Sequence, residues 1–223
     1  MGMIGGATPI YEIVDIEAEL VKKTLPLDKA DQLTVSELRG NYFDLHIIRP
    51  EMIFFRLGEE VGELRAEGTI RLITRRKTPE KALKSFNVLI NIAKKLVEFD
   101  ENTELFNFDI VLILYFESKQ GAKNVIARFI GEEKLNFLQQ ILHEKNTIPY
   151  LGIYLRDFGK EEFKDIINID IEPASKDAEK YYWIKIRREL YNEKGIGNCK
   201  DYIDEMIEKA STIVKALEGI EIV

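Results

Sequence analysis

Two groups of charged residues are the first candidates for chemistry in this chain of 223 residues. Asp15, Glu17 and Glu19 alternate with apolar residues, so their three carboxylates share one side of a predicted strand. Such a row could bind a basic partner or a metal ion, or it could pair with arginines on a neighbouring strand. Collinear carboxylates on one strand are poor metal ligands without further groups, so we expect no metal site and no cofactor.

The second group is basic and occurs twice. A strand-like stretch ends in two arginines at Thr69–Arg76 and again at Tyr181–Arg188, and a long helical pattern follows each stretch. These residues could form a two-fold patch for anions or nucleic acid beside Tyr181 and Trp183, or they could be salt-bridge partners. The full set is Arg71, Arg75, Arg76, Lys77, Lys185, Arg187 and Arg188.

A third candidate is apolar. The stretch Leu105–Glu117 has hydrophobic residues on both faces over part of its length, which is typical of a central strand. Val111, Ile113 and Tyr115 then form a strip on one face. The strip could be a protein interface or a ligand groove, or it could be core beneath another strand.

Recognisable catalytic groups are missing from the sequence. Cys199 lies at a predicted helix start, where a thiolate is favoured, but no base is paired with it. His46 and His143 are interpreted as structural or exposed, and one cysteine with two histidines excludes a structural zinc site of the Cys/His type. No Ser-His-Asp order, glycine-rich phosphate loop or paired catalytic carboxylates are evident, so we expect a protein without enzymatic activity.

Composition limits the class of protein further. The formal net charge of −7 argues against DNA binding by bulk charge, although a local basic patch remains an option. Abundant Glu, Lys and Ile are typical of heat-adapted proteins. The start of the chain lacks a signal-peptide pattern, and no apolar run reaches the roughly 18 residues of a membrane span, so we expect a cytoplasmic protein.

Hydrophobic periodicity predicts the elements that position these residues. In the first half, alternation predicts strands at Tyr11–Val21, Tyr42–Ile48, Met52–Leu57 and Thr69–Arg75, a short helix at Pro26–Leu38, and a polar turn at Glu59–Glu67. Thr78 and Pro79 then begin a long helix.

The second half repeats this order. The predicted strands are Leu105–Glu117, Pro149–Arg156, Asp165–Ile171 and Tyr181–Arg188, and the predicted helices are Glu132–His143 and a last helix that Asn198 caps. The stretch Asn124–Ile130 fits either a strand or a helix.

Each half therefore contains a strand, a helix, three strands and a long helix. We expect an α+β fold in which two pseudo-symmetric repeats, residues 10–100 and 101–223, follow a flexible N-terminus at residues 1–9. Because no flexible linker separates the repeats, they should form one curved antiparallel sheet with helices on one face.

Two short stretches carry a resemblance to a known family. Ile13–Leu20 followed by Leu25–Ala30, and Pro149–Tyr154, are similar to parts of the TATA-binding-protein family. The resemblance implies a saddle-shaped sheet whose concave face, in that family, is largely apolar and wedges paired phenylalanines between base steps. Here Phe54 and Phe55 could supply a wedge in the first half, whereas the matching region of the second half, Ile167–Ile171, has no aromatic residue.

We therefore predict a non-catalytic interaction protein with a TATA-binding-protein-like saddle, which binds a protein or nucleic-acid partner through its open sheet face. The predicted partner-binding residues are Asp15, Glu17, Glu19, Arg71, Arg75, Val111, Ile113, Tyr115, Lys185 and Arg187. The alternative is a small-molecule sensor that uses the aromatic residues Phe106, Phe108, Tyr115, Tyr154 and Trp183.

Overall fold

The computed structural model of the protein describes residues 8–20, 23–27, 45–99, 103–131, 150–156, 164–194 and 196–219, together with 133, 134, 136 and 140. The elements of the first half are β1 (Ile10–Leu20), β2 (Leu45–Arg49), β3 (Met52–Leu57), β4 (Glu60–Arg65), β5 (Thr69–Arg75) and α2 (Pro79–Leu96). Those of the second half are β6 (Glu104–Glu117), α3 (Ala122–Ile130), β7 (Leu151–Arg156), β8 (Lys164–Pro173), β9 (Tyr181–Lys194), the 3-10 turn η2 (Ile196–Asn198) and α5 (Cys199–Leu217).

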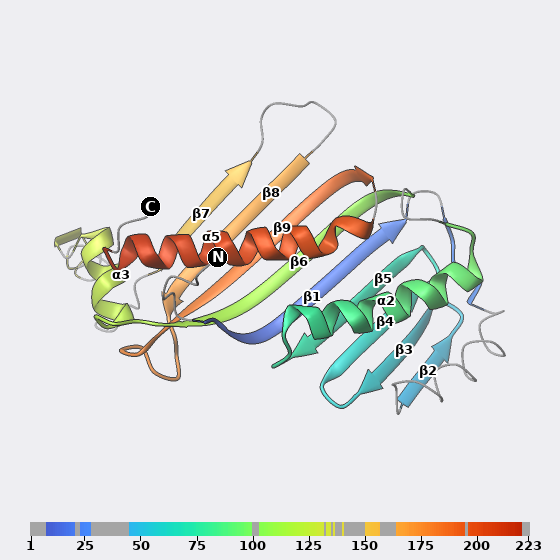
Figure 1. Cartoon of the computed structure of the whole chain (residues 1–223), viewed down its shortest axis with the longest axis horizontal. Helices are drawn as coiled ribbons and strands as arrows, with labels where there is room; N and C mark the ends of the chain where they lie inside the picture. The colour runs from blue at the N-terminus through green and yellow to red at the C-terminus, as the bar shows by residue number, and fades with distance from the viewer. Residues whose placement is uncertain are drawn as a thin grey trace, which may run out of the picture.

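All the described strands belong to one antiparallel sheet in the order β2-β3-β4-β5-β1-β6-β9-β8-β7. The central neighbours are β1 and β6, the first strands of the two halves, and Ile16 lies opposite Ile110 between them. Outward from this pair, each half continues with its own last strand and then runs backwards through the chain (Figure 1). The two halves are therefore related by a pseudo-two-fold axis between β1 and β6.

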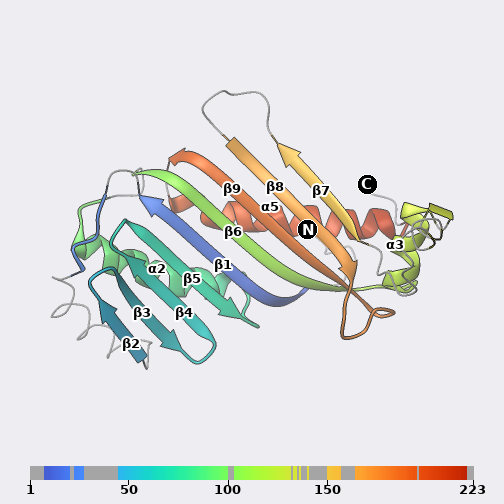
Figure 2. The same ribbon diagram turned by 180° about the vertical axis from the view of Figure 1, so that it is seen from behind.

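The two long helices lie on one face of the curved sheet, and Figure 2 shows the opposite face uncovered. Strand alternation supplies the inner layer, because every second residue of β1 and β6 points toward the helices. The helices contribute matching apolar stripes, which include Phe86 and Leu89 from α2 and Ile203 and Met206 from α5. This architecture confirms the predicted fold class.

One predicted turn is a strand. Glu60–Arg65 forms β4, and its polar residues on the helix side are accommodated by side chains of α2 and of the turn before it. Glu60 is buried, where its carboxylate meets Lys77 Nζ at 2.6 Å and accepts a hydrogen bond from Ser85 at 3.0 Å. Gly62 makes room for α2, because a Cβ there would meet a methyl group of Leu89 at 3.0 Å. Of the three inner positions of β4, one thus holds a paired carboxylate, one is filled by a neighbour's side chain, and the third is the buried Leu64.

Other predicted elements differ in their outcome. The long helices begin at Pro79 and Cys199, as Thr78-Pro79 and Asn198 predicted, although neither preceding side chain forms a capping hydrogen bond. The undecided stretch Asn124–Ile130 is part of helix α3. The predicted helix Pro26–Leu38 falls almost wholly outside the described residues, whereas residues 133, 134, 136 and 140 of the predicted helix Glu132–His143 are described and are helical.

Arg188 does not belong to a surface patch, because it lies on the helix side of β9. Its guanidinium donates to Asp165 on β8 at 2.6 and 3.0 Å and to Glu205 on α5 at 2.6 Å. It also lies 4.5 Å from the ring centre of Tyr202 on α5. With 6% of its side chain exposed, Arg188 joins two strands and the last helix through one buried group.

Replacing Arg188 with Met should lower the free energy of unfolding by about 3 kcal/mol, because it removes one partner of a buried ion pair and leaves Asp165 uncompensated. Denaturant unfolding measures the change. Lys209→Met is the control: it removes only the partly exposed i,i+4 partner of Glu205 and should cost no more than about 0.5 kcal/mol. Equal losses in the two variants would contradict the role assigned to Arg188.

Candidate functional site: the open sheet face

We call the uncovered side of the sheet the open face. On β1, Val14, Ile16 and Ala18 are buried beneath the helices, so the alternate residues point the other way. The same alternation holds on β5, β6 and β9. All ten predicted partner-binding residues therefore lie together on the open face of these four central strands (Figure 2).

The first arginine on this face is held by carboxylates of the neighbouring strand. Arg71 on β5 donates from Nη2 to Asp15 Oδ2 at 2.7 Å and from Nε to Asp15 Oδ1 at 3.0 Å. Its Nε also lies 3.4 Å from Glu17 Oε2. The hydrogen bonds to Asp15 raise the pKa of Arg71 further above its already high value. For Asp15 and Glu17, these contacts agree with the hypothesis that the acidic row pairs with an arginine on a neighbouring strand.

The second half repeats this ion pair. Arg187 on β9 donates from Nη2 to Asp109 Oδ2 at 2.6 Å, and its Nη1 lies 3.1 Å from Glu189 Oε1. Asp109 is not among the predicted partner-binding residues. Strand alternation could have identified it, because Asp109 lies two residues before Val111 and therefore on the same face.

The sheet register shows that the two ion pairs are structural equivalents. Arg71 lies opposite Glu17 and binds Asp15, two residues before Glu17. Arg187 lies opposite Val111 and binds Asp109, two residues before Val111. The expected match between Arg75-Arg76 and Arg187-Arg188 is therefore wrong. It failed because the backbone turns at Arg76, where φ is 53°, whereas β9 continues to Lys194.

One end of the central strands is apolar and carries two cations. Arg75, Ile13, Ile113 and Lys185 lie in one row across β5, β1, β6 and β9. Among the described residues, neither Arg75 nor Lys185 has an ion-pair partner. The next residues outward include Tyr115 and Trp183, which lie opposite each other. Burial, with a hydrogen bond to Glu12, raises the pKa of Tyr115 to about 12.

The other end of the same strands is acidic. Glu17 lies directly opposite Asp109, and Glu19 lies opposite Asn107. Burial raises the pKa of Glu17, and the charge of Arg71 opposes this rise. Burial likewise raises the pKa of Asp109 against the effect of its bond to Arg187. Along the two central strands the open face therefore changes from mainly apolar to anionic, although the strand order is symmetric. At the apolar end Arg75 and Lys185 lie on the flanking strands, with Glu12 beside Tyr115 and Asp170 opposite Lys185.

The register corrects the expectation about aromatic wedges. Phe55 is buried toward the helices, and Phe54 is on the open face. In the sheet register, Phe54 lies opposite Glu63, which lies opposite Arg71. In the second half, Tyr154 lies opposite Asn168, which lies opposite Arg187. Because Arg71 and Arg187 are equivalent, Tyr154 is the counterpart of Phe54. The second half thus has an aromatic residue at this place, and it is 59% exposed. Ile167–Ile171 lies on β8, which corresponds to β4.

The aromatic set proposed for a sensor does not line one cavity. Tyr115, Tyr154 and Trp183 are on the open face, whereas Phe108 is buried on the helix side, 6.2 Å from the ring centre of Tyr202. The side chain of Phe106 lies outside the described ones. Because two faces of the sheet share this set, the sensor hypothesis loses the feature that motivated it.

The remaining candidate for chemistry is Cys199. It lies at the start of α5, as predicted, but it is buried, and burial raises the pKa of its thiol to about 12. That direction is opposite to the one expected at an exposed helix start. Across the described part of the chain, no three Asp, Glu, His or Cys side chains meet in an arrangement that could hold a metal ion.

The observed architecture, with two repeats in one curved sheet and helices on one face, agrees with the fold class expected from the sequence. No family model and no curated protein matches the chain. Among solved structures, the chain is similar to Methanococcus jannaschii TBP over 97% of this chain and 100% of that chain, with 9% sequence identity and a TM-score of 0.39. None of the described helices is both long and apolar enough to span a membrane.

Glu17→Gln should stabilise the protein by about 0.2–1 kcal/mol at neutral pH, because it removes a like charge opposite Asp109. Since the pKa of Glu17 is raised on folding, the stability that this group contributes is present below its ordinary pKa and is lost as the pH rises through the folded value. The advantage of the variant should therefore vanish near pH 4, where the wild-type carboxyl is itself protonated. Denaturant unfolding at both pH values tests this.

Glu19→Gln is the matched control for this experiment. Glu19 is on the same strand and face, but its neighbours Thr69 and Asn107 are uncharged. We expect no comparable gain from Glu19→Gln at neutral pH. A Glu17→Gln variant that is destabilised at neutral pH would show that its contact with Arg71 outweighs the repulsion.

Proposed function

We propose that the protein is a non-catalytic interaction module whose open face binds another protein. The observation that carries this proposal is the polarity of the central strands. An apolar row with unpaired cations, around Ile13 and Ile113, passes into an acidic region around Glu17 and Asp109. A protein surface can match both regions at once, because it can present apolar and charged side chains side by side.

The same charges argue against a nucleic-acid backbone as the partner. Arg71 and Arg187 are already bound by four carboxylates, namely Asp15, Glu17, Asp109 and Glu189. Binding to nucleic acid depends on cations that are free to neutralise phosphates. A duplex along the central strands would meet the acidic end of the face, where phosphates and carboxylates repel each other.

The face also indicates the chemistry of the partner. Ile113, Tyr115 and Trp183 offer an apolar anchor, and aromatic residues of this kind often dominate interface energies. Glu17, Glu19 and Asp109 favour basic side chains at the opposite end. We therefore infer a partner surface with an apolar protrusion at one end and Lys or Arg at the other.

Affinity capture from an extract of the source cells tests this proposal. The immobilised wild type should retain a discrete partner that Ile113→Ser and Glu19→Lys each bind about tenfold more weakly, because they remove the anchor and reverse a charge at the acidic end. Glu208→Lys makes the same charge change at an exposed position of α5 and should retain the partner fully.

A direct titration separates protein from nucleic acid. Trp183 is the only tryptophan of the chain and lies on the open face, so its fluorescence reports binding there. The captured partner should change this signal, whereas a DNA duplex at about 0.15 M salt should not. Duplex binding that falls steeply with salt and is lost in Arg75→Ala/Lys185→Ala would contradict the proposal and favour nucleic acid.

A further inference from the structure

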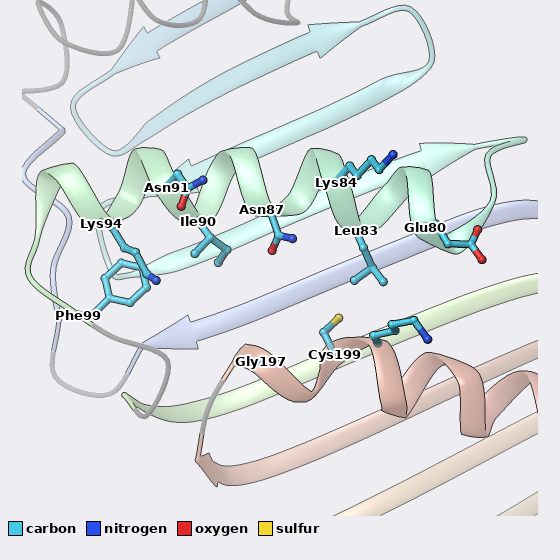
Figure 3. Close-up of a pocket in the computed structure, with 11 residues that line it drawn as sticks. Glu80, Leu83, Lys84, Asn87, Ile90, Asn91, Lys94, Phe99, Gly197 and Cys199 are labelled. Carbon is cyan, nitrogen blue, oxygen red and sulfur yellow. The ribbon is translucent and has the colours of Figure 1, made fainter.

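A groove on the helix side of the sheet lies between α2 and the beginning of α5 (Figure 3). It has a volume of about 740 Å3 and is on the opposite side of the molecule from the open face. One wall is a stripe of α2 that comprises Glu80, Leu83, Lys84, Asn87, Ile90, Asn91 and Lys94. The other wall is formed by Gly197, Cys199 and Lys200, and Phe99 lies beside Lys94 at the end of α2 (Figure 3).

The dimensions of the groove suit an extended occupant. The stripe recurs every three or four residues from Glu80 to Lys94, so it follows one side of α2 for about 20 Å at 1.5 Å per residue. That length corresponds to about four turns of a helix lying alongside α2. A helix that lays its apolar side into a groove between two helices is a common mode of recognition.

The lining combines an apolar surface with positive charge. Leu83, Ile90 and Phe99 supply the apolar part. The charged residues are Lys84, Lys94 and Lys200 against one carboxylate, Glu80. The groove is therefore cationic, although the chain as a whole has a net charge of −7.

Two of these lysines can contact an occupant, Lys94 from within the groove and Lys84 from its outer rim, on the side of α2 away from α5 (Figure 3). Lys84 is exposed and has no ion pair with any described residue. Lys94 lies 5.8 Å from the ring centre of Phe99, so a cation and an apolar surface are presented together. Lys200 already has a partner in Asp204, one turn further along α5.

We propose that this groove binds an acidic amphipathic helix of about four turns that belongs to a partner protein. Leucine-like side chains on one side of that helix would contact Leu83, Ile90 and Phe99. Glutamate or aspartate on its flanks would meet Lys84 and Lys94. This site is independent of the partner proposed for the open face, because the sheet separates the two surfaces.

The test uses a labelled model peptide of roughly sixteen residues with leucines on one helical side and glutamates on the flanks. Fluorescence anisotropy measures its binding to the intact protein. Lys84→Glu/Lys94→Glu should weaken binding at least about tenfold, since two attractions become repulsions. Lys81→Glu/Lys123→Glu is the control: it makes the same charge change at exposed positions outside the groove and should bind like the wild type.

The remaining outcomes are equally decisive. No binding of the peptide, equal binding of a scrambled peptide, or equal losses in the two double variants would each overturn the proposal. Self-association in sedimentation that Lys84→Glu/Lys94→Glu abolishes would assign the groove to a second copy of the chain instead. Trp183 fluorescence should stay unchanged when the peptide binds, so this result stands or falls separately from the open face.

Discussion

The antiparallel pairing of β1 with β6 holds the two halves of the molecule in register. It joins the first strands of the two repeats and makes one sheet of two halves. Its inner side, with Ile16 and Ile110 opposite each other, forms the middle of the core beneath the helices. Because side chains alternate across a strand, a slip of one residue would bury the carboxylates of β1 and expose its apolar residues. The core therefore fixes which residues the open face displays.

Given that register, the charges of the open face need internal partners. The Arg71–Asp15 and Arg187–Asp109 pairs lie at equivalent positions on either side of the pseudo-two-fold axis. They make carboxylates tolerable on the two central strands, which are half-buried by their neighbours. Beyond these pairs the side chains no longer follow the pseudo-two-fold symmetry. The symmetry relates the apolar Ile13 to Asn107 and the apolar Ile113 to Glu19, both at the opposite end of the central strands. A symmetric backbone thus carries a polarised surface.

The helix side is organised differently, with single charged groups that connect layers. Glu60 links β4 to α2 and its preceding turn, and Arg188 links β8 and β9 to α5. Between the two long helices the covering is incomplete, and this leaves the cationic groove. The open face and the cationic groove therefore lie on opposite sides of a single sheet.

The local pattern of apolar residues predicts the fold class, most strands and both long helices, because periodicities of two and of about 3.6 residues follow directly from the geometry of each element. It also determined which residues of β1, β5, β6 and β9 share a face. It missed β4, since Glu60 and Gly62 are suitable inner residues only when Lys77, Ser85 and Leu89 surround them.

The partners of those residues follow from contacts between distant parts of the chain. Asp109 pairs with Arg187, Tyr154 corresponds to Phe54, and Arg188 belongs to the core, all through strand register that no local pattern specifies. The burial of Cys199 and the groove beside α2 likewise arise where segments about a hundred residues apart in the chain pack together. Local sequence sets the direction in which a side chain points, whereas what it meets there depends on long-range packing.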